Sequence, residues 1–91
     1  MNAGPSRREL EAQWRERVNH ARLRYREQAA ICEALMAQRV RTPVADPDGA
    51  FALQHALRVE SQALQEYMWA LRTFTDLVVH GIVPREDSTK G

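Results

Sequence analysis

Residues 10–40 read LEAQWRERVNHARLRYREQAAICEALMAQRV, and apolar side chains recur in this stretch at every third or fourth position. The steps between them repeat in the order 4, 4 and 3, an eleven-residue repeat with about 3.67 residues per turn. Because this period is close to that of an α-helix, the stretch predicts one long helix with a continuous apolar stripe. The stripe consists of Leu10, Trp14, Val18, Ala21, Tyr25, Ala29, Cys32, Met36 and Val40.

A second apolar pattern, in the other half of the chain, has a spacing of seven residues. We call its main line the leucine row: Leu57, Leu64, Leu71 and Val78. A parallel line, the alanine row, is formed by Ala56, Ala63, Ala70 and Leu77. The pattern predicts a second long helix that packs its leucine row on the first helix, with the small side chains of the alanine row at the flank.

The ends of both helices are marked by capping signals. Ser6 and Glu9 have the spacing of a capping box, and Pro43 disfavours helical angles at the residue before it. Asp46 followed by a proline is a good start for the second helix, and Gly81 is a good C-cap residue. The predicted boundaries are helix one at about 6–41, a loop at 42–46, helix two at about 47–80, and tails at 1–5 and 81–91.

These elements predict a single all-α domain, 1–91, formed by a long antiparallel two-helix hairpin. Residues 1–41 carry nine basic and five acidic groups, whereas residues 42–91 carry four basic and seven acidic groups, so the two helices attract each other. A lone hairpin buries only one seam, so we expect dimerisation into a four-helix bundle. The predicted interface residues are Leu57, Leu64, Leu71, Ala56, Ala63 and Ala70. Alternatively, the alanine row receives a helix from a different protein.

Composition narrows the cellular setting and the chemistry. The chain has one cysteine, Cys32, and no apolar run of about twenty residues, which favours a cytoplasmic protein without a membrane partner. Cys32 belongs to the apolar stripe and is interpreted as a small buried side chain, not as a nucleophile. Without a nucleophile motif or a phosphate-binding loop, the sequence favours a protein that is not an enzyme and holds no cofactor.

Glu60 stands where the seven-residue pattern calls for an apolar side chain. A carboxylate in a seam needs a partner, and an antiparallel register brings Tyr25 and Arg26 near it, which predicts a buried polar seam of these three residues. One interpretation is that Glu60 fixes register or oligomeric state. The alternative is a metal-binding or proton-transferring carboxylate, including a site shared with Glu33. The Glu-x-x-His motif of di-iron bundles is absent from the sequence.

Six arginines of helix one form two ridges beside the apolar stripe. We expect their alkyl stems to lie along the seam and their charges to pair with acidic groups of helix two, namely Glu60, Glu66 and Asp76. The alternative is a nucleic-acid surface, but glutamates occupy the outermost face, which argues against a nucleic-acid partner. The first ridge is Arg8, Arg15, Arg22 and Arg26, and the second is Arg17 and Arg24.

Trp69 lies opposite the leucine row on the helical wheel. We expect it to point away from the hairpin, where an exposed tryptophan can anchor an unidentified protein partner.

Taken together, the sequence predicts a self-associating protein-interaction or scaffolding module without catalysis. The alternatives are a metal-binding or small enzymatic bundle centred on Glu60, and a nucleic-acid-associated protein that uses the arginine ridges.

Overall fold

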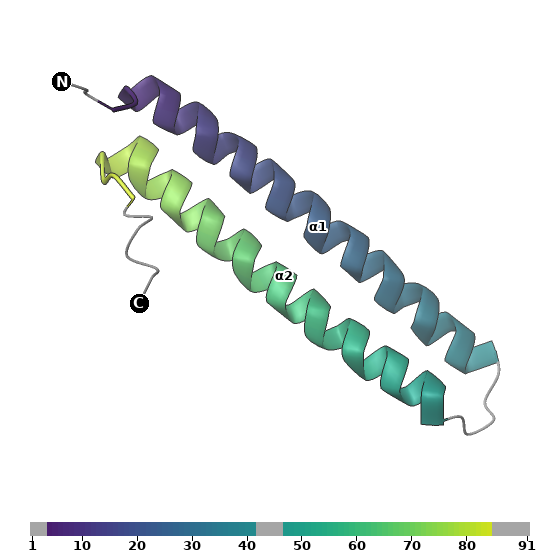
Figure 1. Cartoon of the computed structure of the whole chain (residues 1–91). Coiled ribbons are helices and arrows are strands. Elements are labelled where there is room, and N and C mark those ends of the chain that lie inside the picture. Colours follow the sequence, from purple (N-terminus) through teal and green to yellow (C-terminus); the bar gives the residue numbers. More distant parts are fainter. Residues whose placement is uncertain (1–3, 42–46, 85–91) are drawn as a thin grey trace.

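The computed structural model of this chain describes residues 4–41 and 47–84, which form two helices and no strand. Helix α1 spans Arg7–Arg41 and helix α2 spans Pro47–His80. The helices run antiparallel, side by side along their whole length (Figure 1), so the all-helical prediction is confirmed. The predicted loop at 42–46, with its Asp46 cap, and the tail residues 1–3 and 85–91 lie outside the described residues.

Local hydrogen bonds fix the start of α1 and the end of α2. The Ser6 amide donates to Glu9 Oε1 at 2.8 Å, and the Glu9 amide donates to Ser6 Oγ at 3.2 Å, which confirms the capping box. At the other end, Gly81 adopts a left-handed φ of 69°, and its amide donates to the Leu77 carbonyl at 3.1 Å. Glycine adopts a left-handed backbone conformation without steric strain, so the predicted C-cap is also confirmed.

The seam between the helices is lined by the alanine row and not by the leucine row. Ala56, Ala63 and Ala70 are 6%, 3% and 3% exposed, and Leu77 is fully buried. The prediction that the leucine row packs on helix one is therefore wrong by about one residue, or about 100° around α2. The physical reason is size: the indole of Trp14 is almost completely buried in the seam, and small side chains opposite it leave the room that it needs.

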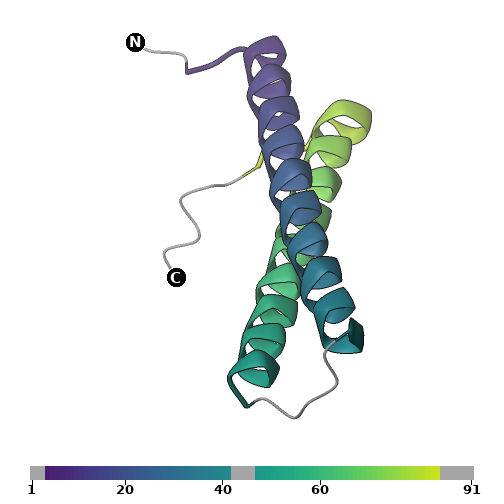
Figure 2. The same ribbon diagram turned by 90° about the vertical axis from the view of Figure 1, so that its right-hand side faces the viewer.

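The core is uneven along the seam. At the open end, where α1 begins and α2 ends, Trp14, Ala70 and Leu77 form one cluster, with Leu10, Val18 and Phe74 packed against it. Toward the closed end, where α1 ends and α2 begins, the buried side chains are smaller, namely Cys32 and Ala56. The helices cross at a shallow angle when viewed from the side (Figure 2). The large side chains are thus concentrated at the open end.

Arg7 ties the two helices together at the open end. Its Nη2 donates to the carbonyls of Leu77 at 2.9 Å and Val78 at 3.2 Å, while its Nε lies 3.3 Å from Glu11 Oε2. The guanidinium supplies donors to carbonyls that the last turn of a helix leaves unsatisfied, and its charge complements the helix dipole. The start of α1 therefore caps the end of α2.

Neither helix combines the length and the apolar character that crossing a membrane requires.

Candidate functional site

The leucine row forms an exposed apolar line along α2. Leu57, Leu64, Leu71 and Val78 are 43%, 36%, 41% and 40% exposed in the single chain. They lie on one face because a spacing of seven residues is close to two helical turns. Their neighbours in the alanine row are buried against α1, so the row lies at the edge of the seam. The hairpin thus covers about half of each of these side chains and leaves the rest open along the length of α2.

The alanine row is not available for contacts with a second molecule. Its side chains are already buried between α1 and α2 within one chain. The predicted interface therefore loses Ala56, Ala63 and Ala70, and the alternative of a foreign helix docked on these alanines is wrong for the same reason. Of the predicted rows, the leucine row is the one that remains accessible.

The first arginine ridge runs beside the leucine row. The Arg15 guanidinium lies over the ring of Phe74, 5.8 Å from its centroid. Phe74 packs against the open-end cluster and, four residues after Ala70, lies about 40° from the alanine row on the leucine side of the wheel. Arg8, Arg22 and Arg26 share the stripe of Arg15 on α1. The accessible face therefore combines an apolar line from α2 with a basic edge from α1.

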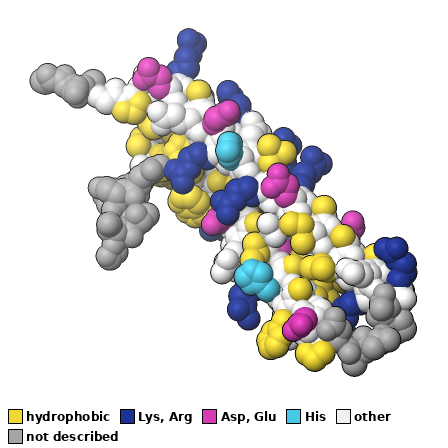
Figure 3. Space-filling view, turned by 45° about the vertical axis from the view of Figure 1, so that its right-hand side comes forward, with side chains coloured by type: hydrophobic (Ala, Val, Ile, Leu, Met, Phe, Trp, Pro, Cys, Tyr) yellow, Lys and Arg dark blue, Asp and Glu magenta, His cyan; other side chains and the backbone are white. Residues whose placement is uncertain are grey.

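Further apolar side chains are exposed toward the closed end. Met36, Val40 and Phe51 each leave half or more of their surface open. The space-filling view shows hydrophobic side chains gathered near this end of the hairpin (Figure 3). Contiguous exposed apolar patches are a general feature of interaction surfaces.

Trp69 does not point away from the hairpin, which corrects the prediction from the helical wheel. Its ring meets that of Trp14 edge-to-face, with centroids 5.4 Å apart and an interplanar angle of 71°. The Arg17 guanidinium lies 4.2 Å from the centroid of Trp14 and 5.3 Å from that of Trp69. The prediction turned the wrong face of α2 toward α1. With the alanine row facing α1, Trp69 lies at one edge of the seam and the leucine row at the other. Half of its surface remains exposed.

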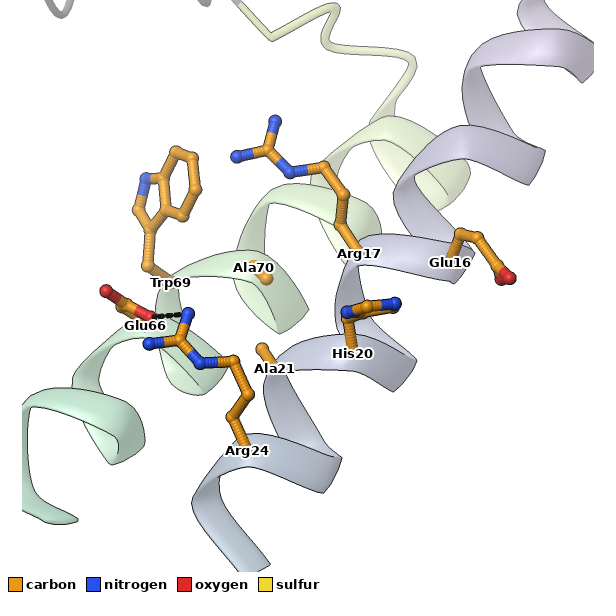
Figure 4. A pocket seen from close by; sticks show the side chains of 8 residues that line it. All are labelled: Glu16, Arg17, His20, Ala21, Arg24, Glu66, Trp69 and Ala70. Atoms are coloured by element: carbon orange, nitrogen blue, oxygen red, sulfur yellow. Dashed lines mark hydrogen bonds and ion pairs between the residues drawn. The ribbon is translucent and has the colours of Figure 1, made fainter. Parts of the chain in front are cut away.

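A shallow groove of about 480 Å³ lies beside Trp69 (Figure 4). Arg24 crosses it to Glu66, with an Nη1–Oε1 distance of 3.1 Å, which confirms the predicted pairing for this arginine of the second ridge, whereas Arg17 lies over Trp14. The formal charges of its two arginines and two glutamates cancel, so the groove does not select a ligand of one sign. It is lined by Glu16, Arg17, His20, Ala21, Arg24, Glu66, Trp69 and Ala70.

Glu60 is half-buried and its partner is Cys32, a contact that the sequence did not reveal. Burial raises the pKa of the Cys32 thiol, and the hydrogen bond to Glu60 and the negative charge of Glu60 raise it further. Cys32 is buried, as predicted. A thiol with a raised pKa stays protonated near neutral pH and is a poor nucleophile.

The predicted buried seam of Glu60, Tyr25 and Arg26 is not formed. Tyr25 stacks on Tyr67, with centroids 6.4 Å apart and an interplanar angle of 16°, and Arg26 is exposed. No polar side chain among residues 4–41 and 47–84 is classed as buried. Within the same ranges, no group of three histidine, cysteine or acidic side chains is placed to hold a metal ion.

Comparisons with known proteins give no relative from which to transfer a function. The sequence matches no protein-family model, and comparison with curated proteins and with solved structures gave no match.

Proposed function

We propose that this chain is a self-associating helical module that acts through protein–protein contact and carries out no catalysis. The observation that carries this proposal is the exposed leucine row, four large aliphatic side chains on one face that the hairpin leaves about 40% open. Burying apolar surface stabilises by about 25 cal/mol per Å². A second helical layer over this face supplies the burial that one seam cannot.

A four-helix bundle of two hairpins is the assembly that suits this face. In a helix bundle every helix buries apolar side chains against two neighbouring helices, whereas in a two-helix hairpin each helix has only one neighbour. In α2, the alanine row fills the side toward α1, and the leucine row presents the second side at about 100° from it. This is the angular separation expected for a helix with two neighbours in a square bundle.

The arginines of α1 support a structural use of their charges over nucleic-acid binding. Arg15 lies over Phe74, Arg17 over Trp14, and Arg24 pairs with Glu66. Phosphate binding needs basic side chains that are directed toward the ligand and have few acidic neighbours. These three arginines instead pack on or pair with side chains of the same hairpin.

Sedimentation equilibrium of the 10.4 kDa chain and of two charge variants tests the proposal. We expect the wild type to sediment at twice the monomer mass at micromolar concentration, and Leu64→Glu to sediment as a monomer because it places a charge in the apolar face. Gln65→Glu is the matched control, since Gln65 is exposed on the side of α2 away from the seam. A monomeric wild type, or an equal loss of association in both variants, refutes self-association through the leucine row.

A further inference from the structure

The leucine row is centred on α2. Leu64 lies close to the midpoint of Pro47–His80, and Leu57 and Leu71 lie seven residues to either side of it. A two-fold axis that passes beside Leu64, perpendicular to α2, therefore places Leu57 of one chain on Leu71 of another. The row is self-complementary in the antiparallel sense, as an isologous interface requires.

We infer that the partner on the leucine row is a second copy of this chain, lying antiparallel, with α2 packed on the partner's α2. In this arrangement Leu64 meets the partner's Leu64, and Leu57 meets the partner's Leu71. The inference rests on the proposed self-association and adds to it the orientation and register of the interface.

One charged pair along α1 fits the antiparallel orientation. Glu33 follows Arg15 by 18 residues, which is five full turns, so the two side chains share one stripe beside the leucine row. The Arg24–Glu66 ion pair sets Leu64 level with the middle of α1. The two-fold axis then brings Arg15 within about one turn of the partner's Glu33, an oppositely charged pair at the edge of the interface.

The parallel alternative is disfavoured by desolvation. When two hairpins face each other in the same direction, the two-fold axis runs along the helices and places α1 over the partner's α2. The arginine stripe of Arg15 and Arg22 then lies on the partner's leucine row, so that charged groups instead of apolar ones cover the leucine side chains. The antiparallel arrangement covers leucine with leucine, and the long side chains of Arg22 and Arg26, which then lie beside the partner's α1, extend toward solvent at the edge of the interface.

Disulfide cross-linking of single-cysteine variants tests the register, because a disulfide needs Cα atoms about 4.4–6.8 Å apart. In a Cys32→Ala background, we expect mildly oxidised Leu64→Cys to run at twice its mass on a non-reducing gel. Leu57→Cys alone and Leu71→Cys alone should stay at the monomer mass, whereas a mixture of these two variants should form the linked dimer. Gln65→Cys, on the far side of α2, is the control for random collision.

The outcomes separate the orientation from the self-association on which it rests. Sedimentation of the Cys32→Ala parent is measured first, and a monomeric parent removes both proposals. A dimeric parent in which Leu57→Cys and Leu71→Cys each link to themselves overturns the antiparallel register and leaves self-association standing. A dimeric parent in which no leucine-row cysteine links faster than Gln65→Cys also overturns the inference.

Discussion

Replacing Ala70 with leucine is the sharpest test of which face of α2 packs on α1. Ala70 is buried in one cluster with Trp14 and Leu77. If the alanine row faced outward, the added side chain would find open space on a helix. Because the row faces the seam, the added atoms meet the Trp14 indole instead.

The sign of the change in unfolding free energy depends on whether the seam has room for the added side chain. Leucine adds three carbon atoms to alanine, worth about 2.4 kcal/mol of stabilisation if they are buried without strain, at about 0.8 kcal/mol for each methylene. Forcing extra atoms into a filled seam costs about 1–3 kcal/mol. Since Trp14 is 1% exposed, the space opposite Ala70 is occupied, and we expect Ala70→Leu to lose about 2 kcal/mol of unfolding free energy.

Urea unfolding followed by circular dichroism measures the effect. With a slope of about 1.5 kcal/mol per M, the expected loss lowers the midpoint by about 1.3 M. Ala30→Leu, the same substitution at an exposed position of α1, is the control and should leave the midpoint nearly unchanged. All variants are compared at one protein concentration, because association couples to unfolding. An unchanged or raised midpoint in Ala70→Leu would show that the seam lies elsewhere.

Three further substitutions test other contacts. Arg7→Ala removes two hydrogen bonds to the end of α2, one of them to the Leu77 carbonyl, and should lower the unfolding free energy by about 1 kcal/mol in urea titrations; Arg7→Lys should recover part of it. Trp69→Ala should cost about 1–2 kcal/mol through loss of its aromatic pair and weaken the near-ultraviolet circular dichroism; an unchanged melting temperature would contradict the observed packing. Because the pKa of Cys32 is raised in the folded chain by burial and by Glu60, the folded state keeps this proton to a higher pH than the unfolded state does. The unfolding free energy should therefore fall as pH rises past about 8.5, and Cys32→Ala should flatten that fall in titrations between about pH 7 and 10.

The features that the sequence predicted well are local ones. The Ser6 capping box and the Gly81 C-cap depend on residues within a few positions of each other, and both are formed. The eleven-residue repeat of helix one likewise needs only the period of an α-helix. Each of these follows from the geometry of one helix, without knowledge of its neighbour.

The rotation of α2 was not predictable from the same pattern, because alanine is compatible with both a seam and a surface. Leucines at intervals of seven favoured the leucine row as the seam, and Trp69 was consequently placed on the outer side. The deciding factor was the volume of Trp14 on the other helix, which alanine accommodates and leucine does not. The contact of Cys32 with Glu60 joins residues of different helices and depends on the register between them, which the pattern of one helix does not fix.

The position of the large core side chains governs how this hairpin folds. Arg7 and the Leu77 carbonyl that it binds are 70 residues apart, and Trp14 meets Ala70 and Leu77 in the same region. A chain that folds from its closed end first orders the layers around Cys32 and Ala56. These layers bury little apolar surface relative to the conformational entropy that is lost on ordering them. The layer that buries the most apolar surface, at the open end, is then ordered last, and its contacts span nearly the whole chain. We therefore expect partly zipped hairpins to be poorly stabilised and the two helices to become ordered together.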